Sequence, residues 1–487
     1  MRRLPPLVFP LVLALVSCIS PAGQFPSSDC TGAVPEQFTR IYIGAPSPQG
    51  QQTGTSAQDP LDGTTADKFD AILRTIADGQ RPTWGTQSQI PPDNLIVCMN
   101  PGVFQTRGQY DWVIPWGHTQ GATNVGFTVG KNWRIHGHGA KRTILRLATV
   151  LTDQFVDNAG NPFPGGHNVV IGTHSTNDSG VEVSDLTIDA NHDSLNRATG
   201  LPLDLDAIVL RSLHGHHWIH DVNIVGASGD LGVRSARYET FPVLIWGDSD
   251  DLDPLQSQGS LVEQVVLTHP GKAVVPGSFP GGTVTAIAVS NAGAEVRNNV
   301  VEGYSIAYGG FAMATAWFHD NTGINNWYGF NADSFTNIDV ILESNKFIHP
   351  VHYGIVMGGS SPQQQFLRWK VLNNTVEINT PNAIGMVLQG QVQASTFARN
   401  KIFSDRPAPR NVAAIVSYSA GGGVANFANY FLENQLDSAE RIDFSQDPYF
   451  DLNCRSLNRD LQDRPRSDFP DNTAVSSVPC ANSGLTR

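Results

Sequence analysis

The chain is poor in charged residues. Lys, Arg, Asp and Glu make up 15% of its 487 residues, against about a quarter in a typical globular protein. Coiled coils and long helices are built largely from Glu, Lys, Ala and Leu, so this composition argues against both. Hydrophobic residues reach 40% and aromatic residues 9%, which suits a packed core and excludes a disordered chain. The 47 glycines and 31 prolines instead indicate many turns and a β-rich structure.

The chain also lacks a dense basic cluster. Its formal net charge is −13, and no stretch gathers enough Lys and Arg to follow a phosphate backbone. Nucleic acid is therefore excluded as an expected partner. A polyanionic substrate would need a local basic cleft or a bridging cation, because an acidic surface repels anionic polymers at long range. No sequence feature fixes the oligomeric state, and we expect a monomer.

No hydrophobic run is long enough to span a membrane. The chain does begin like an export signal, because Arg2 and Arg3 precede a short apolar stretch. Residues 15–18, Leu-Val-Ser-Cys, resemble the lipobox of bacterial lipoproteins. The resemblance implies lipidation at Cys18 and a lipoprotein of the outer membrane or periplasm, attached to the membrane only through that lipid. An ordinary secretory signal, giving a secreted protein, is the alternative.

Cysteines are few, and none has zinc-type spacing. Export would place Cys30, Cys98, Cys454 and Cys480 in an oxidising compartment. Four cysteines allow three pairings, and the sequence does not choose among them. Cys454 and Cys480 both lie in the irregular tail, so a local disulfide there is one expectation. Two reduced thiols are the other.

The chain does contain a repeat of variable length. Beyond residue 180, short strand-like runs recur after an Asp, Asn or Gln, at spacings of 22 to 43 residues. We expect these side chains to bond the equivalent residue of the next coil and to tolerate left-handed backbone angles. The positions taken as equivalent are Asp185, Asp221, Gln264, Asn299, Asn321, Asn345, Asn374, Asn400 and Asn434.

A solenoid explains this repeat better than the alternatives. In helical repeats, apolar residues recur every three or four positions. The apolar residues of these runs do not follow that pattern. A β-propeller needs a steadier period of about 40 residues, and sandwich hairpins usually carry Asn-Gly or Asp-Gly turns, which are scarce. Coils that carry loops of different lengths account for both the shortest spacing and its variation.

The repeats resemble the right-handed parallel β-helix of the pectin-lyase-like superfamily. Residues 133–145 (WRIHGHGAKRTIL) are similar to an early coil of those proteins. The resemblance implies an all-β protein built as a right-handed parallel β-helix. It identifies the architecture and leaves the reaction open.

A short helix is predicted before the solenoid. Residues 66–78 place Phe69, Ile72, Leu73 and Ile76 on one face, and Gly79 follows as a stop. Such a helix would cover the open end of the first coil. The expected organisation is a signal peptide with lipobox at 1–18, a tether at 19–65, an N-terminal cap at 66–93, the parallel β-helix at 94–440, and a C-terminal tail at 441–487.

Equivalent positions in stacked coils should form a surface column. Four to eight residues after the recurring positions come imidazoles, aromatic rings and amides, which suit a polysaccharide because rings pack on sugar faces while polar groups meet hydroxyls. An internal stack of aromatic and Asn side chains is the alternative. The predicted substrate-binding residues are His192, His269, Tyr304, Asn326, Trp327, Tyr328, His349 and Tyr353.

A polysaccharide lyase needs a base for the proton alpha to a uronate carboxylate, and a cation for the enolate that develops. Several candidates cluster after a glycine-rich loop at residues 226–232, where a surface Arg–Glu network is the alternative interpretation. The predicted catalytic residues are Lys272, Arg234, Arg237, Tyr238, Glu239, His352 and Asp189.

A glycoside hydrolase needs two carboxyl groups about 5–10 Å apart. Asp189 and Asp193 share one loop, with Glu302 and Asp333 further along, but the chain has no Asp-Asp pair with a Gly-His motif, as polygalacturonase-type hydrolases of the superfamily would show. Residues 328–333 faintly resemble the Tyr-Gly-Phe-Asp-Pro-His stretch of alginate C5-epimerases. Asn331 replaces its catalytic Asp, so the epimerase function is not carried over. A lyase is therefore favoured over a hydrolase, with a non-catalytic glycan-binding or adhesion protein as the alternative.

An acidic run after an apolar segment is a candidate metal site. It places four carboxylates in six residues, which suits Ca²⁺, an ion with about six to eight oxygen ligands. The run lacks the full EF-hand pattern, and a solvated acidic loop is the alternative. The candidate ligands are Asp248, Asp250, Asp251 and Asp253.

Overall fold

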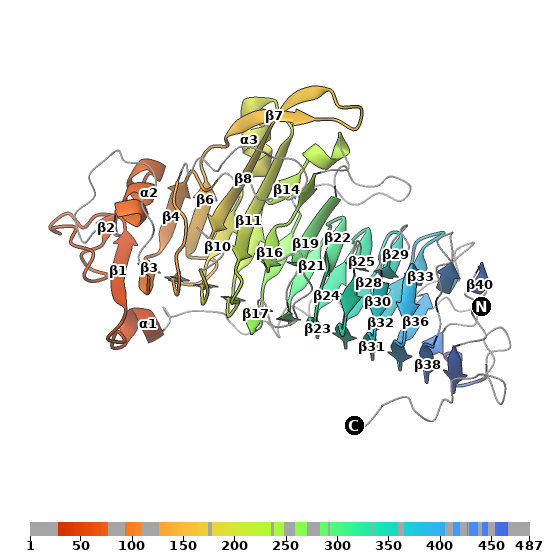
Figure 1. Ribbon diagram of the computed structural model, residues 1–487. Helices are drawn as coiled ribbons and strands as arrows, with labels where there is room; N and C mark the ends of the chain where they lie inside the picture. Colours follow the sequence, from red (N-terminus) through yellow and green to blue (C-terminus); the bar gives the residue numbers. More distant parts are fainter. Residues whose placement is uncertain are drawn as a thin grey trace, which may run out of the picture.

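A computed structural model shows the chain as a right-handed parallel β-helix (Figure 1). It describes residues 28–75, 93–109, 126–173, 178–234, 238–247, 259–269, 283–290, 293–332, 336–358, 365–404, 413–418, 426, 428–436, 441–446 and 453–465. Each full coil contributes one strand to each of three long sheets, which we call sheets 1, 2 and 3 in the order in which a coil visits them. The predicted all-β fold class is confirmed.

Sheet 1 begins each coil. Its strands, in spatial order, are β2 (Leu61–Asp62), β1 (Thr39–Gly44), β3 (Leu95–Met99), β5 (Arg134–His136), β9 (Glu182–Ser184), β12 (Trp218–His220), β17 (Ser260–Glu263), β20 (Ala294–Arg297), β23 (Trp317–His319), β27 (Ile341–Glu343), β31 (Lys370–Leu372), β35 (Thr396–Ala398), β38 (Tyr430–Leu432) and β41 (Cys454–Ser456).

Sheet 2 follows after a tight turn. Its strands are β4 (Gly102–Thr106), β6 (Thr143–Leu147), β10 (Thr187–Asp189), β13 (Asn223–Val225), β18 (Val266–Thr268), β21 (Val300–Glu302), β24 (Thr322–Ile324), β28 (Lys346–Ile348), β32 (Thr375–Ile378), β36 (Lys401–Ser404) and β39 (Gln435–Leu436).

Sheet 3 closes each coil. Its strands are β7 (Thr152–Val156), β8 (Pro162–Gly172), β11 (Leu203–Arg211), β16 (Val243–Trp246), β19 (Thr283–Ser290), β22 (Ile306–Phe311), β25 (Tyr328–Ala332), β29 (Tyr353–Met357), β33 (Ile384–Gln389), β37 (Ala413–Tyr418) and β40 (Arg441–Gln446), with β14 (Ser228–Gly229) and β15 (Glu239–Thr240) at its side. A small sheet of β26 (Asn337–Ile338), β30 (Gln365–Leu367) and β34 (Gln391–Gln393) lies between sheets 3 and 1 along the chain.

The predicted capping helix is confirmed over its described part, as α2 (Ala66–Thr75). The ring of Phe69 lies 6.0 Å from that of Phe104 and 5.7 Å from that of Phe127, so the apolar face of the helix meets the core of the first coil. Asp70 accepts a hydrogen bond from the Thr106 hydroxyl and one from the Arg107 amide. Burial raises the pKa of Asp70 to about 6. Two shorter helices, α1 (Ser28–Thr31) and α3 (His192–Thr199), and a 3₁₀ turn at Leu231–Val233 complete the helical elements of the described chain.

The expected tether and tail are partly wrong, because the solenoid extends into both. Strands β1 and β2 add to the N-terminal end of sheet 1, and the Cys30–Cys98 disulfide fixes α1 to β3. At the other end β40 and β41 continue sheets 3 and 1 beyond residue 440. Cys454 is also disulfide-bonded. Cys480 lies outside the described residues, so the predicted pairing of the two stays a prediction.

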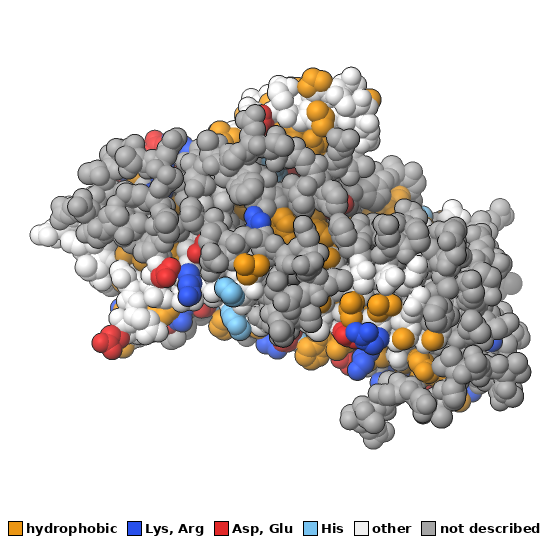
Figure 2. Space-filling model, viewed as in Figure 1, with side chains coloured by type: hydrophobic (Ala, Val, Ile, Leu, Met, Phe, Trp, Pro, Cys, Tyr) orange, Lys and Arg blue, Asp and Glu red, His pale blue; other side chains and the backbone are white. Residues whose placement is uncertain are grey.

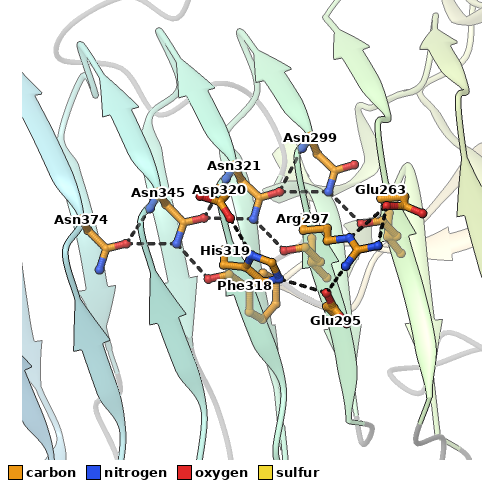
Figure 3. A network of polar contacts seen from close by, with 12 residues as sticks. Glu263, Glu295, Arg297, Asn299, Phe318, His319, Asp320, Asn321, Asn345 and Asn374 are labelled. Carbon is orange, nitrogen blue, oxygen red and sulfur yellow. Dashed lines mark hydrogen bonds and ion pairs between the residues drawn. The ribbon is translucent and has the colours of Figure 1, made fainter. Parts of the chain in front are cut away.

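An asparagine ladder lines the turn from sheet 1 to sheet 2 (Figure 3). The side-chain amide of each member donates to the side-chain oxygen of the next at 2.9–3.0 Å, and the members are at most 1% exposed. They are Asn299, Asn321, Asn345, Asn374, Asn400, Asn434 and Asn458. The predicted hydrogen bonding between coils is thus confirmed for the six Asn positions, and it extends to Asn458.

The predicted register is wrong by one residue in the three earlier coils. Strand pairing aligns Asn299 with Val265, and Val265 with Val222, rather than with Gln264 and Asp221. Asp185, Asp221 and Gln264 instead have left-handed φ values of 58°, 53° and 54°, like Asn298 at 54°. We predicted that one residue has both roles, but two adjacent residues divide them. The first adopts the left-handed conformation, and the second occupies the ladder position.

Candidate functional site

The turn from sheet 2 to sheet 3 forms a corner that runs along the solenoid. Strand register places Thr268, Glu302, Ile324 and Ile348 at equivalent positions in successive coils. The residues that follow them, His269, Gly303, Asn325 and His349, therefore stack along one edge. We call this edge, with residues 189–192, 226–228, 269, 303–305, 325–328 and 349–353, the corner.

Four of the predicted residues meet in one aromatic cluster at the corner. The rings of Tyr328 and Tyr353, from neighbouring coils, are stacked with centroids 5.2 Å apart and planes 5° apart. The imidazole of His352 lies 3.8 Å from the Tyr353 ring, 5.9 Å from the Tyr328 ring and 5.2 Å from the Trp327 ring. Trp327 is buried, while the other three are partly exposed. The cluster thus presents two phenols and an imidazole at the surface.

The protonation of His352 follows from its surroundings. Burial lowers its pKa below the ordinary value of 6.5. A neutral imidazole at neutral pH accepts a proton, which is the property that a general base needs. His349, one turn earlier, has a ring nitrogen 3.5 Å from the carboxylate of Glu377.

Tyr304 and Asn326 lie inside the coil and not on its surface. Tyr304 is fully buried, and its hydroxyl donates to the carbonyl of Ala227 at 3.2 Å. Asn326 is 1% exposed; it accepts a hydrogen bond from the Tyr304 amide at 2.8 Å and donates to Val301. Their surface position was wrongly predicted, because sequence offset alone does not tell an inward side chain from an outward one.

The N-terminal part of the corner is occupied by ion pairs. Asp189 accepts from Arg146 at 2.7 Å. His192 is buried, with its ring nitrogens 2.9 Å from Asp230 and 3.3 Å from Asp193. Burial lowers the pKa of His192, but the hydrogen bonds and charges of the two aspartates outweigh it and raise the pKa.

His269 contacts both the coil before it and the coil after it at the corner. One of its ring nitrogens is 3.0 Å from the Ser228 hydroxyl, and its ring meets that of Tyr304 edge-on at 5.1 Å. The side chain is partly exposed.

The cluster predicted at residues 234–239 is a packing feature where it is described. Tyr238 is buried, with its ring 5.2 Å from Phe155 and its hydroxyl accepting from the Val156 amide at 3.1 Å. The guanidinium of Arg234 lies 5.1 Å from the centre of the Phe163 ring. Glu239 is half-buried in β15. Tyr238 and Arg234 thus pack on aromatic rings, and Arg237 lies outside the described residues.

Several predicted residues lie outside the described part of the chain. These are Cys18, Arg237, Lys272, Asp248, Asp250, Asp251 and Asp253.

A carboxylate pair on sheet 3 was missed by the sequence interpretation. Asp204 and Asp206 are on β11, and a ring nitrogen of His167 on β8 is 3.1 Å from an oxygen of Asp206. Their carboxylates also accept from the amides of Leu231 and Phe241. Burial raises the pKa of Asp204 to about 6. The signal was present as alternation in Leu-Asp-Leu-Asp at residues 203–206, which puts both carboxylates on one face of a strand.

A second missed group, Asp29, His136 and Glu182, brings three potential metal ligands within 4.8 Å of one another on sheet 1. It does not fit Ca²⁺, which prefers oxygen ligands, because one donor is an imidazole nitrogen. Arg134 also donates to Asp29 at 2.7 Å and lies 3.8 Å from Glu182. The bonds from His136 and Arg134 hold the pKa of Asp29 well below its usual range despite burial. The group is therefore an ion-pair network.

Similar proteins are found among solved structures. No protein-family model and no curated protein matches the chain. Among solved structures, the A-module of the Azotobacter vinelandii mannuronan C-5 epimerase AlgE6 is 11% identical with a TM-score of 0.42, over 82% of this chain and 96% of that one. The Yersinia enterocolitica family 28 exopolygalacturonase is 10% identical with a TM-score of 0.48, over 85% and 80%.

A third similar structure is the Streptococcus pneumoniae surface protein and adhesin PfbA, which is 10% identical with a TM-score of 0.45, over 75% of this chain and 89% of that one. At such identities the likeness concerns the coil alone and does not identify a reaction. In fold, the chain is a right-handed parallel β-helix.

Proposed function

We propose that this protein cleaves a uronate-containing polysaccharide by elimination at the corner. The observation that carries the proposal is the cluster of His352, Tyr328 and Tyr353, which presents a neutral imidazole and two phenols on adjacent coils at the surface. Rings of this kind offer packing surfaces to sugars, while their polar atoms meet hydroxyls.

The reaction would proceed by proton transfer. His352 takes the proton alpha to the uronate carboxylate, the electrons of that C–H bond form a carbon–carbon double bond, and the bond to the leaving glycosidic oxygen breaks. A tyrosine hydroxyl of the cluster, or water, returns a proton to the leaving oxygen. The developing enolate needs a positive charge, and Lys272 and Arg237 are our proposed sources of it. The proposed substrate-contacting residues are the partly exposed His269, Tyr328, His349 and Tyr353. Trp327 is buried and packs on His352.

Hydrolysis is the second candidate, because Asp204 and Asp206 form the carboxyl pair that it requires. Asp204, with a pKa of about 6, could act as the general acid. Asp206, which contacts His167, could act as the second carboxylate. The difference in exposure between the two sites supports elimination. Asp204 and Asp206 are each 1% exposed, so a polymer meets His352 and the tyrosines first. For that reason we favour elimination.

The experiment is a panel of uronic-acid and neutral polysaccharides, with unsaturated products and new reducing ends both followed. We expect unsaturated products from at least one uronate polymer and a loss of about a hundredfold or more in His352→Ala, the scale of a removed general base. His214→Ala is the matched control, since His214 is an exposed histidine on the turn between sheets 3 and 1. Binding without cleavage across the panel would instead support a glycan-binding or adhesion protein.

Export, lipidation and calcium are further parts of the proposal. We propose that Cys18 carries the lipid and that residues 248–253 bind Ca²⁺. Mass spectrometry of the mature N-terminus tests the first, with Cys18→Ala as the comparison. Activity and thermal stability in a calcium chelator test the second, because a calcium site predicts loss of one of them and recovery on adding the ion.

A further inference from the structure

The outer face of sheet 1 carries the same four-residue arrangement twice. Residues 218–221 are Trp-Ile-His-Asp, and residues 317–320 are Trp-Phe-His-Asp. In both, Trp and His point outward from the strand, the residue between them is fully buried, and the Asp has a left-handed φ of 53° or 54°. The repetition lies in β12 and β23, which are not neighbouring strands.

The side-chain contacts within the two copies are also the same. The Trp218 ring stacks on the His220 ring with centroids 4.0 Å apart and planes at 27°, and the Trp317 ring stacks on the His319 ring at 4.0 Å and 26°. Nδ1 of His220 is 2.9 Å from Asp221, and Nδ1 of His319 is 2.7 Å from Asp320.

The other imidazole nitrogen faces a glutamate in both copies. Nε2 of His220 is 3.2 Å from Glu182, and Nε2 of His319 is 3.0 Å from Glu295. Both glutamates come from the preceding coil. In the strand register, Glu182 lies opposite Trp218 and Glu295 lies opposite Trp317. Figure 3 shows the polar contacts of the second copy, with His319 between Asp320 and Glu295. Each imidazole is therefore fixed on both sides, and it holds the indole beside it in one orientation.

Both tryptophans are exposed, unlike the others in the described chain. Trp218 is 40% exposed and Trp317 is 37% exposed, whereas the remaining described tryptophans, Trp133, Trp246, Trp327 and Trp369, are at most 7% exposed. An indole is the largest apolar side chain, and leaving two of them in water forgoes the free energy that their burial would supply. A ligand that covers them would recover it.

The distance between the two tryptophans follows from the register. Trp218 pairs with Leu261, Leu261 with Glu295, and Glu295 with Trp317. Three steps between parallel strands amount to about 14 Å along the solenoid axis. This is longer than one sugar ring, so a chain of several sugars would be needed to reach both.

Charged groups occupy the surface between the tryptophans. The guanidinium of Arg297 forms ion pairs with Glu263 at 2.9 Å and with Glu295 at 2.8 Å. The indole N–H of Trp218 donates a hydrogen bond to Glu263 at 3.0 Å. In Figure 2, charged, His and hydrophobic side chains alternate along the lower edge, where Figure 1 labels β17, β23, β31 and β38. A protein partner or a lipid surface would favour a contiguous apolar patch, which these charges interrupt. Isolated rings beside hydrogen-bonding groups suit a sugar chain.

We propose that the outer face of sheet 1 is a second carbohydrate-binding site, which takes a neutral glycan along the solenoid axis with one sugar on Trp218 and another on Trp317. The hydroxyls of the sugars would meet the carboxylates of Glu263 and Glu295. Those carboxylates, with Asp221 and Asp320, outnumber the cations beside them and repel uronates, so this site and the corner select different polymers.

The test is affinity electrophoresis of the mature protein in gels that contain a soluble β-glucan, a galactomannan or polygalacturonate. All proteins carry His352→Ala, so the assay does not depend on cleavage, and a failure of the proposed reaction leaves this result interpretable. Variants are Trp218→Ala, Trp317→Ala and their combination. Val103→Ala is the matched control, because Val103 is 48% exposed on sheet 2, away from the site.

We expect at least one neutral polymer to retard the parent protein, each single variant to raise the apparent Kd about tenfold, and the double variant to migrate as it does without polymer. The control should bind like the parent. Where an alanine variant does not fold, the glutamine variant at the same position gives the same comparison. Absence of retardation by both neutral polymers, or retardation of the double variant like the parent, would overturn the proposal.

Discussion

The side-chain amide of Asn321 donates to the side-chain oxygen of Asn345 at 2.9 Å, and the same oxygen accepts the backbone N–H of Asn321 at 3.1 Å. One side chain in each coil thus satisfies two donors of the coil before it. Because adjacent pairs repeat the relationship, the ladder fixes the stacking of the coils, and hence the positions of side chains at the corner and on sheet 1.

Asn345→Ala should destabilise the protein more than a neighbouring surface change. It removes the acceptor of both Asn321 donors, and the donor to Phe318 and Asn374, in a fully buried turn. We expect the free energy of unfolding to fall by about 2–4 kcal/mol, the cost of leaving such groups unpaired. Chemical denaturation measures the change. Lys346→Ala, one residue later, is the control because Lys346 is exposed, and it should shift stability by less than about 0.5 kcal/mol.

His220 should stabilise the protein in its charged form. Burial alone would lower its pKa, but hydrogen bonds to Asp221 and Glu182 and their charges raise it to about 9. A folded-state pKa above the ordinary 6.5 gives stability that is complete below pH 6.5 and is lost as the pH rises through 9.

The comparison of wild type with His220→Gln tests this sign. We expect the difference in unfolding free energy to be larger at pH 6 than at pH 10 by roughly 2 kcal/mol. A difference that is constant with pH, or one that grows as the pH rises, would show that the imidazole is not held in its charged form.

Reduction of the Cys30–Cys98 disulfide should loosen the N-terminal end of the solenoid. The bond closes a separation of 68 residues, and the chain-entropy argument assigns such a bond roughly 2–5 kcal/mol. Cys30→Ala/Cys98→Ala should therefore lower the melting temperature. Non-reducing peptide mapping should recover the Cys30 and Cys98 peptides as one species, and recovery of either peptide with Cys480 would contradict the pairing.

The acid limb of the pH–activity profile should lie below pH 6.5. Burial lowers the pKa of His352 from 6.5, so the imidazole stays unprotonated, and able to act as a base, into mildly acidic solution. The value of kcat/KM as a function of pH measures the limb. Tyr353→Ala removes the ring stacked on His352 at 3.8 Å and should move the limb upward. An upward shift in an unrelated exposed-histidine variant, His214→Ala, would argue against His352 as its source.

Most of the fold was predictable because the repeat encodes it. The ladder asparagines, the spacing of the coils and the apolar face around Phe69 gave the solenoid and its capping helix. The one-residue error at Asp185, Asp221 and Gln264 arose because a polar residue in this turn serves either as the left-handed turn residue or as the ladder residue. Composition at the turn does not distinguish the two roles.

The site was harder to predict, because function depends on which way each side chain points. Tyr328 and Tyr353 lie side by side because strand register pairs them, and His352 directly precedes Tyr353. Tyr304 and Asn326 had the same spacing but turned inward. The contacts of His167 with Asp206, and of His220 with Glu182, join residues 39 and 38 positions apart. Only the stacking of coils brings such pairs together.

The central claim, elimination at the corner, is tested most directly by the ratio of unsaturated ends to new reducing ends when the protein degrades a uronate polymer. Elimination creates an unsaturated end at each broken linkage, so the account predicts equal numbers of the two ends, with both lost in His352→Ala. New reducing ends without unsaturated ends would contradict the account and favour hydrolysis, for which Asp204 and Asp206 are the candidates.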